Sequence, residues 1–165
     1  MNNVDEPTTT VRATVNGQAV EAEVPVRLSL ADWLRDGLGL TGTHLGCEHG
    51  ICGCCNVLLD RVDVRSCLLL AVQVDGHEVV TVEGLEGPDG ELNPVQQAFC
   101  DTHALQCGYC TPGMVVAGTR LFRDDPHAEE DRVEEALGGT ICRCTGYQQI
   151  REAMQRATAA PGGKA

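Results

Sequence analysis

The sequence predicts an α+β protein in which a β-rich half is followed by a helical half. Apolar and polar residues alternate over residues 9–24, which is the period of a half-buried strand. From about residue 93, apolar residues recur at the spacing of amphipathic helices. A stretch rich in glycine and acidic residues separates the two patterns. We therefore expect two domains, at residues 9–83 and 93–158, joined by a linker over residues 84–92.

The β-rich half opens with a predicted hairpin. Its two alternating segments flank Asn16-Gly17, a dipeptide that favours a tight turn with positive φ. A helix is expected next, over residues 28–40, with Ser29 as its N-cap and Gly37 at its end. Short apolar runs then predict strands at residues 57–59, 64–67 and 79–82.

The helical half is expected to contain four short helices. Asn93 is suited to cap the first and Pro94 to open it, and this helix is predicted to reach His103, with Leu105 toward a core. The others are expected from Thr111, in the acidic segment 128–139, and from Gly146 onward. Residues 159–165 are predicted to form a disordered tail.

Composition and charge exclude several classes of function. The 165-residue chain has a formal net charge of −12, whereas binding to nucleic acid or anionic membranes requires a basic surface. No apolar run reaches the roughly 18 residues that begin to span a bilayer. The N-terminal segment MNNVDEPTTT lacks the basic flank and apolar stretch of an export signal. We therefore expect a cytoplasmic protein with no nucleic-acid partner and no membrane span.

The ten cysteines are the most unusual feature of this composition. Thiols stay reduced in the cytosol, so disulfides are disfavoured. Aromatic residues are only 3% of the chain, and a chain with a small aromatic core and many thiols is typically stabilised by metal. Structural zinc and iron–sulfur clusters are the two remaining interpretations.

The first group of cysteines favours an iron–sulfur cluster. Cys47, Cys52 and Cys55 have the C-x4-C-x2-C spacing of plant-type [2Fe–2S] proteins, and Cys67 is the natural fourth ligand. The intervening loop is rich in glycine, which allows tight turns with backbone amides directed at the sulfur atoms. A zinc knuckle rarely has a third cysteine five residues upstream.

The second group is ambiguous on spacing alone. It consists of Cys107, Cys110, Cys142 and Cys144, in the motifs QCGYCTPG and ICRCTGY. A C-x2-C followed some distance later by a C-x-C is unusual for either metal, so zinc and [2Fe–2S] both remain open at this point. Two quartets leave Cys54 and Cys100, which we expect to be small buried hydrophobic residues.

These motifs together resemble the iron–sulfur small subunit of the molybdenum hydroxylases, the family of xanthine dehydrogenase, aldehyde oxidoreductase and aerobic carbon monoxide dehydrogenase. The resemblance rests on GLTGTHLGCEHGICGCC at residues 39–55, RSCL at 65–68, QCGYCTPGM at 106–114 and CRCTGY at 142–147. It extends over roughly residues 10–158. It implies a β-grasp, ferredoxin-like domain with one [2Fe–2S] cluster and a four-helix domain with the other.

The resemblance also implies cofactors and partners. A large subunit would carry a molybdenum pterin, in its cytosine dinucleotide form, and a medium subunit would carry FAD, in a dimer of heterotrimers. Electrons would pass from molybdenum through both clusters to FAD. Gln106 would then hydrogen-bond the pterin, and Cys144 would approach it while ligating iron.

This chain is expected to contain no substrate pocket and no catalytic acid, base or nucleophile. Two alternatives stay open: the same relay in a two-subunit enzyme without FAD, and a free-standing ferredoxin-like electron shuttle.

Overall fold

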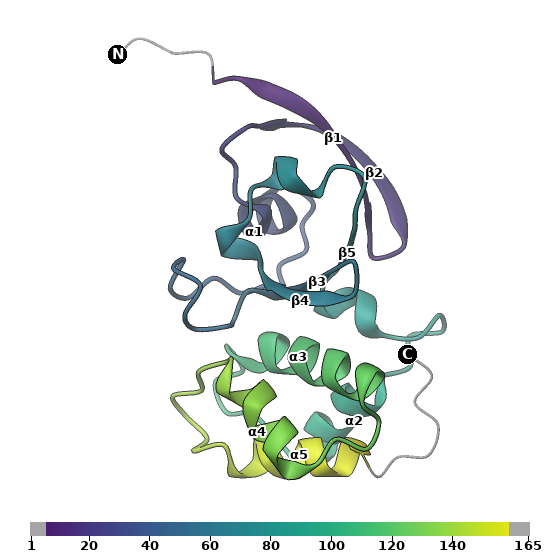
Figure 1. The fold of residues 1–165 in the computed structure, drawn as a ribbon, viewed down its shortest axis with the longest axis vertical. Helices are drawn as coiled ribbons and strands as arrows, with labels where there is room; N and C mark the ends of the chain where they lie inside the picture. The colour runs from purple at the N-terminus through teal and green to yellow at the C-terminus, as the bar shows by residue number, and fades with distance from the viewer. Residues whose placement is uncertain (1–5, 159–165) are drawn as a thin grey trace.

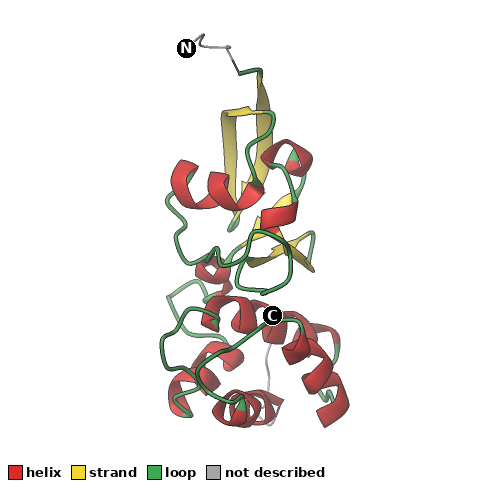
Figure 2. Ribbon diagram, turned by 90° about the vertical axis from the view of Figure 1, so that its left-hand side faces the viewer, coloured by secondary structure: helices red, strands yellow, loops and turns green. Residues whose placement is uncertain are grey.

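The computed structural model describes residues 6–158 and divides into a sheet half and a helical half, as Figures 1 and 2 show. The strands are β1 (Thr8–Val15), β2 (Gln18–Pro25), β3 (Asn56–Leu59), β4 (Val62–Arg65) and β5 (Glu78–Val80). The helices are α1 (Leu30–Asp32), α2 (Pro94–Asp101), α3 (Thr111–Asp124), α4 (Glu130–Gly138) and α5 (Gln148–Thr158). The predicted order, a sheet followed by helices, is confirmed.

The five strands form one mixed sheet in the order β2-β1-β5-β3-β4. β1 pairs antiparallel with β2 and parallel with β5, so the N-terminal hairpin and the later strands share a single sheet. The predicted hairpin is confirmed, because Asn16 and Gly17 connect the strands with φ of 49° and 76°. The inward positions of β1 are buried in the core of this half.

The helix predicted over residues 28–40 is shorter than expected. Ser29 caps α1 as predicted, accepting a hydrogen bond from the Asp32 amide at 3.0 Å. The chain then widens into a π-helical turn over Trp33–Gly37. The Leu38 amide bonds the Trp33 carbonyl, and Gly39 leaves the helix with φ of 72°. Helical spacing in the sequence therefore overestimates this element.

Of the three strands predicted after α1, β3 ends at Leu59 as expected, whereas β4 and β5 end earlier than predicted. The early end of β4 positions a predicted ligand. β4 stops at Arg65, and Cys67 lies in a 3₁₀ turn over Ser66–Leu68 instead of in the strand. The Ser66 hydroxyl donates to the Cys55 carbonyl at 2.7 Å, which turns the chain toward the cluster loop. β5 likewise ends at Val80, and Val82 begins another 3₁₀ turn.

The helical half is capped as the sequence predicts but differs in detail. Asn93 and Gln96 form a capping box at the start of α2. The helix ends at Asp101, before His103, which takes a φ of 52°. The expectation that Leu105 faces the core is wrong, because it is exposed and Ala104 takes the buried position.

The two leftover cysteines have different surroundings. Cys54 is buried, as predicted, and packs in the core of the helical half although it belongs to the first cysteine loop. Cys100 is exposed, so the expectation of a buried residue is wrong there. The buried residues of α2 are Val95, Ala98 and Phe99, and Cys100 follows them on the side of the helix turned to solvent.

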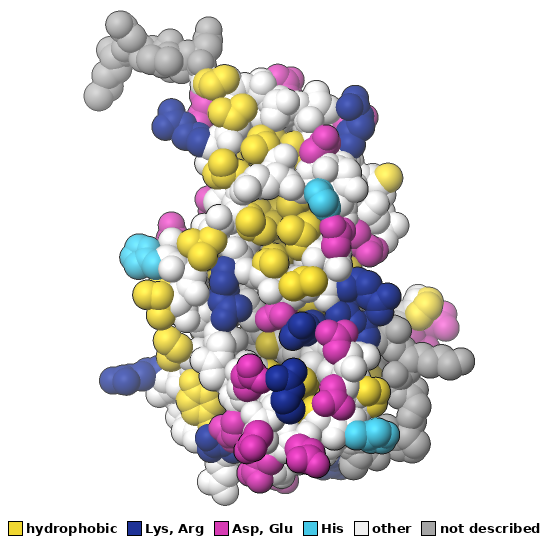
Figure 3. Space-filling model, viewed as in Figure 1, with side chains coloured by type: hydrophobic (Ala, Val, Ile, Leu, Met, Phe, Trp, Pro, Cys, Tyr) yellow, Lys and Arg dark blue, Asp and Glu magenta, His cyan; other side chains and the backbone are white. Residues whose placement is uncertain are grey.

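Charged side chains of both signs cover the helical half on the face that Figure 3 shows, whereas hydrophobic side chains gather over the sheet half. In the part of the chain that the structure describes, no helix has the length and apolar character needed to cross a membrane. The domain limits proposed from the sequence stay predictions, and the predicted tail lies outside the described residues.

Candidate metal centres

The first cysteine loop folds around the sulfur of Cys47. The amides of His49 and Cys52 both donate hydrogen bonds to Cys47 Sγ, each at 3.4 Å. The loop reaches this shape through left-handed residues, with φ of 55° at Glu48 and 75° at Gly50. A Cβ at Gly50 would lie 2.3 Å from Leu68 Cδ1 and would displace that side chain, and the positive φ itself favours glycine at this position.

The four predicted ligands of the first centre lie together as two pairs. The Cys47 side chain interacts with that of Cys52, and the Cys67 side chain interacts with that of Cys55. The 3₁₀ turn at Ser66 brings Cys67 to this position. The structure thus gathers residues from the loop and from the end of β4 into one group of thiols.

The second group is arranged in the same paired way. Cys144 Sγ donates to Cys107 Sγ at 3.5 Å, and the Cys110 side chain interacts with that of Cys142. Cys107 and Cys110 precede α3, and Cys142 and Cys144 lie between α4 and α5. Helix ends that are distant in sequence therefore meet at one site.

Paired thiols are the donor set that a [2Fe–2S] cluster requires, because each of its two irons takes two cysteine thiolates. Among the described residues 6–158, no three Cys, His, Asp or Glu side chains converge in a geometry suited to a single metal ion. The paired arrangement of the thiols is the feature that fits a two-iron group in both quartets.

Hydrogen bonds lower the pKa of one thiol in the first quartet, Cys47, and of two in the second, Cys107 and Cys142, the last of these against the opposing effect of burial. The Cys52 and His49 amides lower the pKa of Cys47 to about 6. The pKa of Cys107 is lowered mainly by a hydrogen bond from the Tyr109 amide and, to a smaller extent, by a hydrogen bond from the Cys144 thiol. Burial raises the pKa of Cys110 to about 12. Metal ligation requires thiolates, so filling the sites releases the remaining protons.

Two tyrosines support the second centre, and sequence reasoning did not identify either. The Tyr147 hydroxyl accepts from the Cys142 amide at 2.8 Å and donates to the Thr140 carbonyl at 3.1 Å, which fixes the CRC segment. Tyr109 stacks on His44 of the first loop, with ring centroids 4.8 Å apart. A tyrosine inside each cysteine motif was the signal that could have found them.

The two centres are connected directly through the backbone. The Ile141 amide donates to the Cys52 carbonyl at 2.8 Å. Cys52 belongs to the first quartet, and Ile141 immediately precedes Cys142 of the second. Buried Cys54 lies beside both groups, within electrostatic reach of Cys52 and Cys110. One hydrogen bond therefore links Cys52, a predicted ligand of the first centre, to Ile141, which is bonded to the predicted ligand Cys142 of the second centre.

Each centre also has a side that faces outward. At the first, Ile51 and Leu68 are 66% and 60% exposed. At the second, Gln106, Cys107 and Cys144 are exposed, and Tyr109 and Ile141 beside them are 47% and 49% exposed. Apolar side chains exposed around a site are typical of a surface that meets another protein.

Comparisons with protein families and known proteins identify iron–sulfur binding domains in both halves of the chain. Residues 13–83 match the 2Fe-2S iron-sulfur cluster binding domain, and residues 81–155 match the [2Fe-2S] binding domain. The chain is 49% identical over 148 residues to the caffeine dehydrogenase subunit gamma of Pseudomonas sp. (strain CBB1), with 88% of each chain covered. It is 50% identical to the nicotine 6-hydroxylase small subunit of Paenarthrobacter nicotinovorans, covering 91% of this chain and 90% of that subunit. This chain belongs to the iron–sulfur subunits of the molybdenum hydroxylases.

A solved structure supports the same assignment. Quinoline 2-oxidoreductase from Pseudomonas putida 86 matches with a TM-score of 0.87 and 44% identity, covering 92% of this chain and 94% of that chain. As a member of this family, the iron–sulfur subunit is the electron-transfer component of an oxidoreductase. Partner subunits follow from the multi-subunit enzymes to which its relatives belong.

The hydrogen bonds to Cys47 predict an ordered reactivity in the cluster-free chain. Because its pKa is about 6, Cys47 is a thiolate at neutral pH and is expected to react first with iodoacetamide. Its labelling rate should decrease as the pH falls through about 6. Buried Cys54, with a pKa of about 12, should react late. Peptide mapping by mass spectrometry checks the order, and equal rates at the two positions would contradict it.

Proposed function

We propose that the two quartets hold one [2Fe–2S] cluster each, and that the chain carries electrons between a molybdenum pterin and FAD on partner subunits. The ligands would be Cys47, Cys52, Cys55 and Cys67 for the first cluster and Cys107, Cys110, Cys142 and Cys144 for the second. In fold terms, a β-grasp ferredoxin-like domain would precede a four-helix domain. The observation that carries this proposal is the arrangement of the thiols as two pairs in each of two adjacent groups.

The clusters, when bound, supply one-electron chemistry. The protein holds the thiolates, donates amide hydrogen bonds to sulfur and limits the access of water. Amides of His49, Cys52 and Thr145 already donate to ligand sulfurs. Such bonds stabilise negative charge on the sulfur atoms and thereby set the reduction potential.

The outward side of the second centre supports a place for it next to the pterin. Gln106, Cys107 and Cys144 all lie on this exposed surface. A glutamine amide offers both a donor and an acceptor, which suits hydrogen bonding to a pterin ring. We propose that Gln106 meets the pterin there and that Cys144 approaches it while ligating iron.

The first centre would face the flavin subunit. Ile51 and Leu68 beside it are exposed, and the Leu68 side chain lies directly against Gly50 of the cluster loop. With one outward side at each centre, the chain would sit between its two partners in a heterotrimer that forms a dimer. A molybdenum pterin in the cytosine dinucleotide form and an FAD-containing medium subunit complete the proposed enzyme.

The names of several relatives point to a class of substrate for the assembled enzyme. Proteins named for caffeine, nicotine and quinoline match this chain at 44–50% identity. Relatives named for aldehydes match at 36–42%, among them aldehyde oxidase 2 of Cavia porcellus at 42% and Escherichia coli PaoA at 38%. We propose that the enzyme oxidises an N-heteroaromatic compound at a site on the large subunit.

Removing one ligand tests the assignment of the clusters. Cys107→Ser is expected to remove the second cluster and leave the first, so the purified protein should lose half of its iron and one of two EPR signals. Cys100→Ser is the matched control, because Cys100 is exposed and belongs to neither quartet. A Cys107→Ser variant that retained all its iron and still reduced FAD with substrate at the normal rate would refute the proposal.

A second variant tests the proposed role of Gln106. In the assembled enzyme, Gln106→Ala is expected to leave iron content and both EPR signals unchanged while slowing reduction of the clusters by substrate several-fold. Gln97→Ala is the control, since Gln97 is exposed on α2 and its side chain donates to Asp101 of the same helix. Identical rapid-mixing rates in the two variants would show that Gln106 does not act toward the pterin.

The class of substrate is tested on the purified complex with an artificial electron acceptor. We expect quinoline and nicotine to support turnover at a higher kcat/KM than simple aromatic aldehydes. A preference for aldehydes would overturn this part of the proposal and leave the relay role intact.

A further inference from the structure

The two cysteine loops meet at a contact between glycines. Gly53 lies between Cys52 and Cys55 of the first loop, and Gly113 lies at the start of α3, three residues after Cys110. A Cβ at Gly113 would lie 2.2 Å from the Gly53 carbonyl oxygen. The backbones of the two halves therefore approach more closely than any side chain would allow.

The other side of Gly53 is equally close to the second centre. A Cβ there would lie 2.4 Å from the Gly139 carbonyl oxygen and 2.6 Å from Thr140 Oγ1. Thr140 and Ile141 lead directly into Cys142. The peptide at Gly53 is thus held between the two segments that carry the ligands of the second centre, and the Cys52–Ile141 hydrogen bond of 2.8 Å is next to it.

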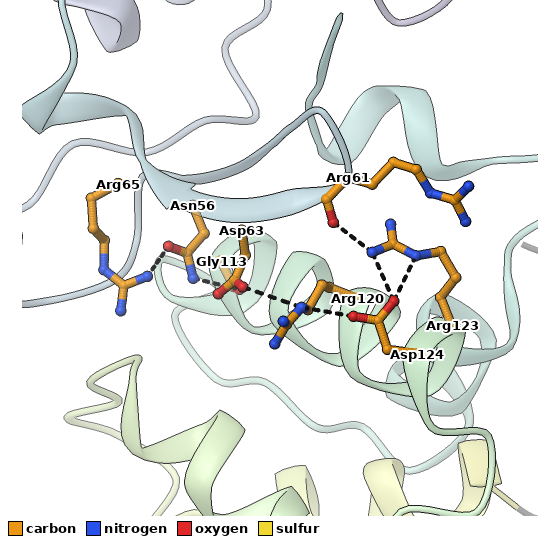
Figure 4. A network of polar contacts seen from close by, with 8 residues as sticks. All are labelled: Asn56, Arg61, Asp63, Arg65, Gly113, Arg120, Arg123 and Asp124. Atoms are coloured by element: carbon orange, nitrogen blue, oxygen red, sulfur yellow. Dashed lines mark hydrogen bonds and ion pairs between the residues drawn. The ribbon is translucent and has the colours of Figure 1, made fainter.

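Polar contacts across the same boundary keep the glycines together. Asn56 Nδ2 donates to the Gly113 carbonyl at 3.4 Å, and the Arg65 guanidinium donates both to Asn56 Oδ1 and to the Gly139 carbonyl. Figure 4 shows Asn56 between Arg65 and Gly113. A planar guanidinium that bonds two acceptors at once fixes their relative position.

A second set of contacts, further along α3, also joins the helical half to the sheet half. Arg120 pairs with Asp63 of β4 at 3.6 Å and with Asp124 at 3.1 Å. Arg123 donates to the Arg61 carbonyl and pairs with Asp124, as Figure 4 also shows. These bonds join α3 to the β3–β4 hairpin over most of the length of the helix.

We propose that the Gly53–Gly113 contact is the positioning feature that sets the separation of the two clusters and, through it, the rate of electron transfer between them. The inference rests on the proposed function, because it requires a cluster in each quartet. Electron transfer through protein slows steeply as separation increases. A methyl group at position 113 would move the loops apart and weaken the bonded route from Cys52 through Ile141 to Cys142.

Gly113 is the better position for a test than Gly53. Gly53 has a φ of 75°, so any side chain there would also strain the backbone. Gly113 has an ordinary helical backbone, and alanine favours a helix more than glycine does. Gly113→Ala therefore changes the available space without adding backbone strain. Gly138→Ala is the matched control, because a Cβ at Gly138, in α4, meets nothing within 4 Å.

The experiment uses the complete enzyme, reduced by dithionite, and measures the magnetic interaction between the clusters by low-temperature EPR. We expect Gly113→Ala to keep its iron and both signals, with a weaker interaction and a several-fold slower transfer between clusters after rapid mixing with substrate. Gly138→Ala should match the natural protein. An unchanged interaction and rate in Gly113→Ala would overturn the inference.

The outcome separates this inference from the proposed function. If the enzyme without substitutions gives only one iron–sulfur EPR signal, the proposed function with one cluster in each quartet is refuted, whatever the variants show. If Gly113→Ala loses iron, the same EPR measurement is made on Arg65→Ala. This variant removes the hydrogen bonds to Asn56 and Gly139 and leaves every cysteine in place. A weaker magnetic interaction in Arg65→Ala supports the positioning role, and an unchanged one refutes it.

Discussion

The hydrogen bond between the Cys52 carbonyl and the Ile141 amide is the contact on which this molecule depends. At 2.8 Å it joins the sheet half to the helical half. Cys52 is itself a predicted ligand of the first centre, and Ile141 immediately precedes Cys142 of the second. The glycines beside it allow the backbones to approach this closely. Because protein interiors are close-packed and barely compressible, this hydrogen bond and the glycine contacts beside it are the basis for the proposed fixed separation of the two sites.

The thiols also connect folding to metal binding. The sheet half has a core of mostly small aliphatic residues around Trp33, and the chain as a whole is only 3% aromatic. Each quartet joins segments that are distant in sequence, such as Cys55 with Cys67 and Cys107 with Cys144. A cluster held by such ligands links the ends of long loops, and its binding energy contributes to folding.

Local chemistry could be predicted from the sequence, whereas long-range geometry could not. The Asn16-Gly17 turn and the Asn93 cap depend on a few neighbouring residues, and both form as expected. Three members of the first quartet could be predicted because their spacing lies within one loop, whereas Cys67 follows β4. The second quartet became specific only through the family motifs. The π-helical turn at Trp33 and the exposure of Cys100 and Leu105 depend on tertiary contacts that have no local signature. The same is true of the Gly53–Gly113 contact, which joins residues from separate domains.

The most direct measurement is low-temperature EPR of the dithionite-reduced enzyme, together with iron and zinc analysis of the same sample. Two distinct iron–sulfur signals, with iron present and zinc absent, are the result that two thiolate quartets predict. A colourless protein that contains zinc, or a reduced sample with a single paramagnetic centre, would contradict the account.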